Sequence, residues 1–166
     1  MSYYSEIVER IQKEVKKVDK YPPSFTKKFI DLDRKNCYAY ALNLNINDPE
    51  KRVLFPGCIS DENEDPDIYS ETSLMKRLKR DLNFLGFSYR ENDIRLKEGE
   101  YRIAIYAFPT FHDCPIGFHI SRQDKDCYWS EKPNWKASPR RLDYNGIDAP
   151  DIESAYFKTV LIIRKG

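Results

Sequence analysis

One cysteine and one histidine in this sequence have the side-chain types and local settings that nucleophilic catalysis requires. Cys37 follows Asn36 at the start of a short predicted helix, residues 36–42, where a thiol lies at the positive end of the helix dipole. In such a place, and beside a protonated imidazole, the pKa of a cysteine falls from about 8.5 to about 3.5–7.5, and the thiolate is the nucleophile. His119 lies in the strand-like segment 117–122 and is one of only two histidines, so it is the leading candidate for the general base.

Both residues of the pair Asn36 and Cys37 also have an ordinary structural interpretation. Free cysteines are commonly small buried hydrophobes, and asparagine is a frequent N-cap. In the functional interpretation, backbone N–H groups at the helix start hold an oxyanion, and Asn36 donates to it or fixes the loop that carries Cys37. One helix end would then serve both to activate the thiol and to stabilise the transition state.

The elements that must position these residues follow from hydrophobic periodicity, with helices first and strands afterwards. Helical spacing of apolar residues predicts a helix over 5–18 and a longer one from 72 or 73 to 85, ended by Gly86. A loop rich in proline, glycine and acids separates 36–42 from the longer helix. The strand-like segments are 101–108, 117–122, 127–130 and 156–163, with Lys125-Asp126 as a hairpin turn. This order predicts an α+β domain with a mostly antiparallel sheet.

Length and net charge indicate the number of domains and the kinds of partner to expect. A chain of 166 residues favours a single domain over 1–166, here with a helical extension over 1–30 and a core over 36–163. Its 28 basic and 27 acidic residues give a net charge of +1. Nucleic-acid binding needs a concentrated basic surface, so we expect no nucleic-acid partner.

The sequence also lacks the features of a membrane or secreted protein. No apolar run approaches the roughly 20 residues that cross a bilayer, and the polar N-terminus lacks the apolar stretch of a signal peptide. We therefore expect no membrane partner and a cytoplasmic location, from which cell lysis could release the protein. The four cysteines form no C-x-x-C pair, and reduced thiols are the default in that compartment.

Several short motifs, taken in order, resemble a known group of sequences. The segments are NCYAYA at 36–41, PG at 56–57, FHISRQD at 118–124 and WSEKP at 129–133. They resemble uncharacterised bacterial and phage proteins with the pattern N-C-Y-A-Y-A, P-G, F-H-x-x-R-Q-D and W-S-H-K-P-G. That group is similar to the papain-like cysteine peptidases and amidases, near the NlpC-type cell-wall peptidases. Each motif is weak alone, whereas the ordered set is more specific.

The resemblance implies a papain-like core and assigns roles to individual residues. Cys37 matches the nucleophile on the first core helix, and His119 matches the base on the second strand of the sheet. The residue that orients the histidine falls at Glu131, where the related pattern has histidine. A carboxylate can also hold the far N–H of an imidazole, and Asp124 is the reserve candidate for this role.

The expected function is that of a cysteine hydrolase. Cys37 would attack an amide or isopeptide carbonyl and form a thioester, while His119 moves the proton. No cofactor is expected. Relatives of this kind indicate a peptide, a protein or a peptidoglycan stem peptide as substrate, and transfer to another amine is a close variant. The sequence does not indicate the oligomeric state.

Two alternatives compete with this interpretation. The first is a zinc site made by His112, Cys114, His119 and Cys127, although structural zinc sites usually show closely spaced pairs. The second is a catalytically inactive papain-like binding module, for which the change of histidine to glutamate at position 131 would be the signature. Reaction with a thiol-directed reagent distinguishes an activated cysteine from a structural one.

Overall fold

The computed structural model describes residues 22–25, 36–44, 54–61, 71–108, 117–133 and 137–166. The helix predicted over 5–18 and most of the loop between 45 and 70 lie outside these ranges. Two helices and one sheet of six strands make up the described fold. The helices are α2 (Cys37–Ala41) and α3 (Glu71–Phe84). The strands are β1 (Phe87–Glu91), β2 (Glu100–Ala107), β3 (Phe118–Gln123), β4 (Trp129–Glu131), β5 (Arg140–Arg141) and β6 (Phe157–Lys165).

The sheet is antiparallel at each of its strand pairs. Its strand order is β1-β6-β2-β3-β4-β5, and the long strands β2 and β6 pair along their length from Glu100↔Arg164 to Ala107↔Phe157. The predicted α+β class with a mostly antiparallel sheet is therefore confirmed. The strands predicted over 101–108, 117–122, 127–130 and 156–163 correspond to β2, β3, β4 and β6.

Strands β1 and β5 are absent from the sequence-based prediction. The first has the sequence FSYRE and follows α3 after a two-residue turn, so its short alternation was hidden behind the helical pattern. The second is only the pair Arg140–Arg141, and two arginines carry no strand signal. Both strands form because a neighbouring strand offers a ladder of backbone partners.

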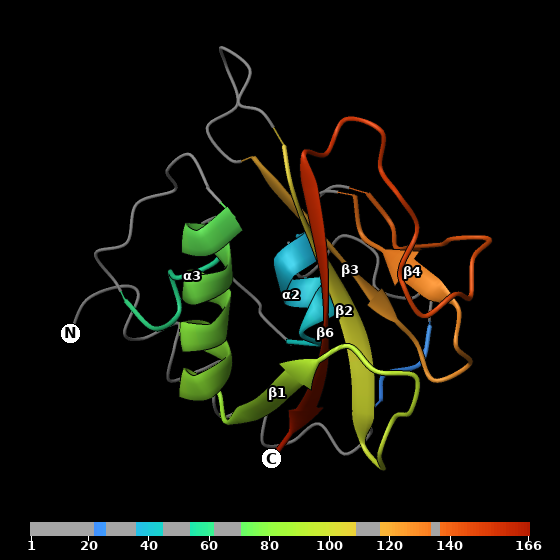
Figure 1. Cartoon of the computed structure of the whole chain (residues 1–166), viewed down its shortest axis with the longest axis horizontal. Helices are drawn as coiled ribbons and strands as arrows, with labels where there is room; N and C mark the ends of the chain where they lie inside the picture. The colour runs from blue at the N-terminus through green and yellow to red at the C-terminus, as the bar shows by residue number, and fades with distance from the viewer. Residues whose placement is uncertain (1–21, 26–35, 45–53, 62–70, 109–116, 134–136) are drawn as a thin grey trace.

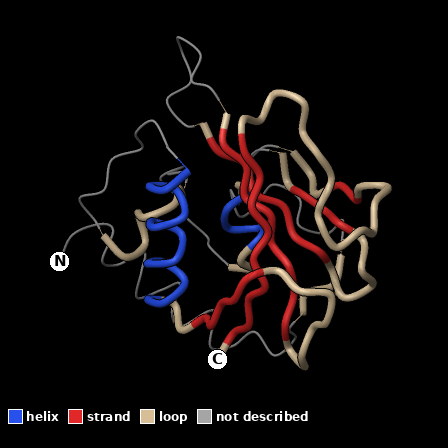
Figure 2. The backbone as a smooth tube through the Cα atoms, in the orientation of Figure 1, coloured by secondary structure: helices blue, strands red, loops and turns tan. Residues whose placement is uncertain are grey.

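Hydrophobic side chains cover both faces of the sheet. Helices α2 and α3 pack with one face and form the larger core cluster, together with residues of the loop 54–59. The opposite face carries a smaller cluster around Tyr106 and Trp129, covered by the segment 142–155. Figures 1 and 2 show the helices on one side of the sheet and the long connection between β5 and β6 on the other. Trp129 is fully buried in this cluster.

Helix α3 has the leucine stripe that the sequence predicts. Leu74, Leu78 and Leu82 are completely buried, because a repeat of four residues keeps them on one face. The chain then reverses at Gly86, whose φ of 81° lies in the left-handed region. Glycine adopts this conformation without the steric cost that a Cβ atom adds, so the helix ends and β1 begins at once.

A buried carboxylate on α3 connects this helix to α2 and to the loop 55–60. Asp81 accepts hydrogen bonds from the Tyr38 hydroxyl (2.6 Å), the Gly57 N–H (2.7 Å) and both the N–H and the hydroxyl of Ser60 (2.8 and 2.6 Å). Burial raises the pKa of Asp81 although these bonds act to lower it. One side chain thus holds Tyr38, next to Cys37, and the Pro56-Gly57 turn in fixed positions.

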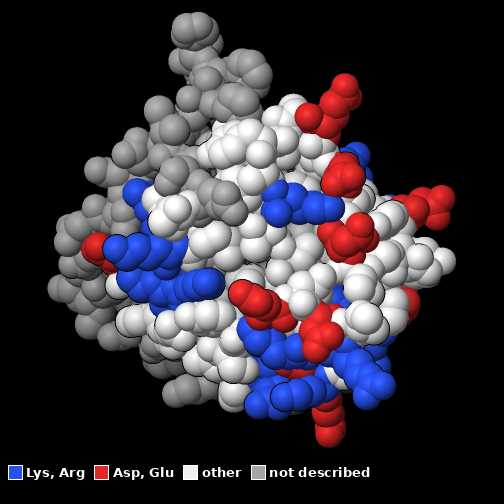
Figure 3. Space-filling model, viewed as in Figure 1, with Lys and Arg blue, Asp and Glu red and all other residues white. Residues whose placement is uncertain are grey.

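The face of the molecule in Figure 3 carries charges of both signs. Figure 3 shows basic and acidic side chains mixed over the visible face, as the near-neutral net charge of +1 suggests. Among the described residues, no helix is long and apolar enough to pass through a membrane.

We predict that Asp81→Asn destabilises the fold by about 2–3 kcal/mol. The amide would place N–H donors against the donors that now face the carboxylate, and buried groups without partners cost about 1–3 kcal/mol each. Urea denaturation measures the change. The matched control is Asn83→Ala, two residues along the same helix and exposed, for which we expect a change below about 0.5 kcal/mol. Equal stability of the two variants would contradict this role of Asp81.

Candidate active site

Helix α2, which carries Cys37, is positioned by its surroundings rather than by its own stability. It has only five residues, far below the roughly 12–15 that an isolated helix needs. Asn36 caps it: the side-chain oxygen accepts from the Ala39 N–H (3.2 Å), and the side-chain nitrogen donates to the Leu54 carbonyl (2.5 Å). These contacts make Asn36 the N-cap of α2, its ordinary structural interpretation, and both ends of its amide are bound to backbone groups.

The other end of α2 is tied to the sheet by buried polar contacts. The Tyr40 hydroxyl hydrogen-bonds with the Ser130 hydroxyl (2.7 Å), and Arg122 donates to the Tyr40 carbonyl (2.9 Å). The Arg122 guanidinium also lies over the Tyr40 ring, 3.8 Å from its centroid. Tyr101 on β2 donates to the Ala41 carbonyl (2.9 Å). The short helix therefore has a fixed place against β2, β3 and β4.

His119 lies near the start of β3, between a thiol and a carboxylate. Its Nε2 is 2.6 Å from Oε2 of Glu131 on β4, and the Cys37 side chain lies close enough to the ring to raise its pKa. Because Nε2 is bonded to the carboxylate, Nδ1 is the ring nitrogen left for the sulfur. The structure thus brings together the three residues expected to act in catalysis, although they are far apart in the sequence.

Tyr106 is the cross-strand partner of His119 and packs beside it. The two residues face each other in the β2–β3 pairing, and their ring centroids are 6.1 Å apart. The Tyr106 hydroxyl donates to the Pro150 carbonyl (2.6 Å), which holds the phenol in place. The imidazole is consequently confined on one side, and only 14% of the His119 side chain is exposed.

The charges of this cluster favour a protonated imidazole. Burial by itself lowers the pKa of His119, but its contacts with Cys37 and Glu131 outweigh burial and raise the pKa to about 9. Burial acts to raise the pKa of Glu131, but hydrogen bonds and charge from His119 and Arg140 hold it below its usual value. At neutral pH the arrangement is therefore an imidazolium bonded to an ionised carboxylate, with the Cys37 side chain nearby.

Arg140 is a member of this cluster that the sequence did not indicate. It lies on β5 opposite Glu131 in the β4–β5 pairing, and its guanidinium contacts the second carboxylate oxygen, Oε1, through Nε (2.7 Å) and a terminal nitrogen (2.5 Å). Its only signal in the sequence is a basic residue nine positions after Glu131, which is common in any charged segment. The pairing of two short strands, which the sequence pattern hides, creates the contact.

Asp124, the reserve candidate for orienting His119, has other partners. Its two oxygens bind the Arg122 guanidinium (2.8 Å) and the Ser130 hydroxyl (2.5 Å), so it belongs to the network that ties α2 to the sheet. Burial raises the pKa of Asp124 against the lowering influence of Arg122. Of the two acidic candidates, Glu131 is the one that contacts the imidazole.

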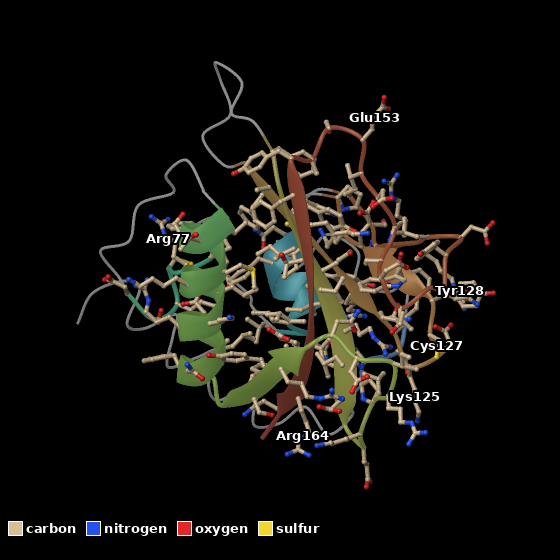
Figure 4. All side chains as sticks on the ribbon, in the orientation of Figure 1. Arg77, Lys125, Cys127, Tyr128, Glu153 and Arg164 are labelled. Carbon is tan, nitrogen blue, oxygen red and sulfur yellow. The ribbon has the colours of Figure 1, made fainter. Side chains whose placement is uncertain are left out.

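Two of the four residues of the alternative zinc site, His112 and Cys114, lie outside the described ranges. Cys127 is exposed and lies in the turn between β3 and β4 (Figure 4), with Lys125 and Tyr128 beside it. Within the residues that the structure describes, no group of three histidine, cysteine, aspartate or glutamate side chains is arranged to hold a metal ion.

Comparison with known proteins gives no match for this chain. No family model matches it, and no curated protein and no solved structure shows significant similarity. The site must therefore be interpreted from its own geometry.

We predict that the His119 ring titrates with a midpoint near pH 9 and that Glu131→Gln lowers this midpoint toward 6.5. The variant removes a negative partner of the imidazolium, and Cys37→Ala acts in the same direction. Since the pKa is raised in the folded state, the stability gained from protonated His119 is complete below about pH 6.5 and is lost as pH rises through about 9. NMR of the two imidazoles measures the midpoint, with His112→Gln to assign the signals.

Asp124→Asn is the matched control for that titration. It removes a buried carboxylate of the same sheet that does not touch the ring, so the midpoint of His119 stays near 9. A midpoint that Glu131→Gln leaves unchanged would show that the carboxylate does not act on the imidazole.

Proposed function

We propose that this protein is a papain-like cysteine hydrolase that cleaves an amide or isopeptide bond. The observation that carries the proposal is a nearly buried imidazole with the Cys37 thiol on one side and the Glu131 carboxylate on the other. The arrangement of elements supports it: the cysteine begins a helix packed on an antiparallel sheet, the histidine lies on β3, and the acid lies on the adjoining strand β4. Such a triad is recognised by geometry and roles.

In the first half of the proposed reaction, the proton of the Cys37 thiol already resides on His119, and the sulfur attacks the substrate carbonyl as a thiolate. A bond forms between sulfur and carbon while the carbonyl oxygen becomes an oxyanion. The backbone N–H of Cys37, at the first position of α2, is the proposed donor to that oxygen. The tetrahedral intermediate then collapses, His119 gives its proton to the leaving amine, and a thioester remains on Cys37.

In the second half, a water molecule replaces the amine. His119 takes a proton from the water, the hydroxide adds to the thioester carbon, and the carbon–sulfur bond breaks. The products are a free carboxylic acid and the regenerated pair of a Cys37 thiolate and a protonated His119. Throughout the cycle Glu131 accepts the Nε2–H of His119, which keeps Nδ1 directed at the sulfur and favours the protonated ring.

We propose the substrate only by its chemical class. A peptide, a protein side chain or a peptidoglycan stem peptide presents the required carbonyl and an amine leaving group. Acceptance of a second amine in place of water would make the protein a transferase by the same steps. Glu131, which the resemblance places where a histidine is common, keeps the bond to the imidazole, and this favours an active site over an inactive binding module.

We predict that iodoacetamide alkylates Cys37 much faster than the other described cysteines, and that His119→Ala slows this reaction at least about tenfold at pH 7. Without the imidazole, a thiol with a pKa of about 8.5 is only a few per cent ionised at neutral pH. The two rates should converge above about pH 9, where His119 loses its proton. Peptide mapping by mass spectrometry gives the rate at each cysteine.

Two cysteines of the same chain are internal controls for that experiment. Cys58 is buried, and burial raises its pKa to about 12, so it should stay unmodified in the folded protein. Cys127 is exposed and should react at the rate of an ordinary surface thiol in both proteins. If Cys37 reacts no faster than Cys127, the proposed activation is wrong.

A further inference from the structure

We propose that Arg140 is the positioning residue of this site. It holds Oε1 of the Glu131 carboxylate, so that Oε2 is directed at His119. The inference rests on the proposed function, since the action of Arg140 on Cys37 passes through Glu131 and His119. It adds a fourth member to the three residues that the sequence indicates.

The geometry of the Glu131 carboxylate is the first argument. Its two oxygens have different partners: Oε2 binds Nε2 of His119 at 2.6 Å, and Oε1 binds the Arg140 guanidinium at 2.7 and 2.5 Å. A carboxylate held at one oxygen can still rotate about its side-chain bonds. Contacts at both oxygens define its plane, and this directs Oε2 at the imidazole.

The backbone supplies the second argument. Glu131 and Arg140 are direct partners in the β4–β5 ladder, where opposite side chains on one face have Cβ atoms about 4.5–5.5 Å apart. Strand β5 consists of only two residues, and this pairing places its first arginine beside the acid. The contact is therefore set by the sheet and does not depend on a chance meeting of two long side chains.

Unequal exposure of the two partners is the third argument. The Arg140 side chain is 64% exposed, whereas that of Glu131 is 7% exposed. Water screens the exposed guanidinium, which limits the contribution of Arg140 to stability. Its acceptor, however, is nearly buried, and a buried carboxylate without a counter-charge tends to take up a proton. Arg140 thus acts on the charge and direction of Glu131.

The charged groups around Glu131 determine the direction of its pKa shift. Among the described residues, His119 from β3 and Arg140 from β5 are the charged groups that face it, and both lower its pKa against the effect of burial. The phenol of Tyr106 on β2 also feels this carboxylate, but burial raises the pKa of Tyr106 to about 12. Tyr106 is therefore neutral over the range in which Glu131 and His119 titrate.

The neighbouring arginine provides a matched control. Arg141 lies next to Arg140 on β5, yet its guanidinium pairs with Asp126 and stacks over the Tyr128 ring, 4.3 Å from the centroid. Its side chain is 44% exposed. Arg140→Gln and Arg141→Gln therefore remove the same charge from adjacent positions of one strand, and only the first touches Glu131.

The experiment measures the Glu131 pKa by carboxyl NMR, together with the pH profile of Cys37 alkylation by iodoacetamide in the full chain. We expect Arg140→Gln to raise the Glu131 pKa by about one unit, the low end for loss of an arginine neighbour. The acidic limb of the alkylation profile should move to higher pH. Arg140→Lys should restore part of both effects, and Arg141→Gln should change neither. In a Glu131→Gln background, Arg140→Gln should add nothing.

The outcomes separate this inference from the proposed function. If Cys37 of the wild type reacts fast and selectively but Arg140→Gln behaves like Arg141→Gln, the inference about Arg140 is overturned and the hydrolase proposal stands. If Cys37 of the wild type reacts as an ordinary thiol, the proposed function fails. In that case the NMR titration of Glu131 alone tests the inference about Arg140. A raised Glu131 pKa in Arg140→Gln supports this inference, and an unchanged pKa overturns it.

Discussion

A buried imidazole that contacts a carboxylate and lies under the influence of a cysteine side chain is the interaction on which the interpretation of this protein depends. Taking His119 out of water disfavours its protonated form, and the two partners reverse that cost, so that its pKa is raised to about 9. Such an arrangement requires ionisable groups from separate elements to be held within hydrogen-bond distance in a poorly hydrated place. Perturbed groups of this kind cluster at functional sites.

Most of the surrounding fold can be understood as the frame for that interaction. Helix α2 is too short to stand alone, and its position comes from polar contacts: Asn36 at its start, the Tyr38–Asp81 bond to α3, and the Tyr40–Ser130 bond to β4. Pairing of β3 with β4 brings Glu131 to His119, and pairing of β4 with β5 brings Arg140 to Glu131. A change in sheet register by one residue would turn these side chains to the opposite face.

The sequence predicts the elements that have a local hydrophobic or capping pattern. It does not predict the strands that form only because they pair with a neighbouring strand. The leucine stripe of α3, the N-cap at Asn36 and the strands β2, β3, β4 and β6 follow from periodicity and capping. The strands β1 and β5 do not, because five and two residues form strands only when a neighbour offers a ladder. The same distinction applies to the site: Cys37, His119 and Glu131 have sequence signals, whereas Arg140 gains its meaning from a cross-strand contact. The choice of Glu131 over Asp124 likewise depended on side-chain direction, which spacing does not provide.

The most direct measurement is the trapping of an acyl-enzyme. Incubation with p-nitrophenyl acetate, a simple acyl donor, followed by acid quenching and peptide mapping, shows which side chain becomes acylated and how fast the acyl group leaves. We expect a thioester on Cys37 that forms rapidly and is then hydrolysed, with both steps slowed strongly in His119→Ala. Acylation spread over surface groups, or a Cys37 adduct whose formation and loss do not depend on His119, would contradict the proposed mechanism.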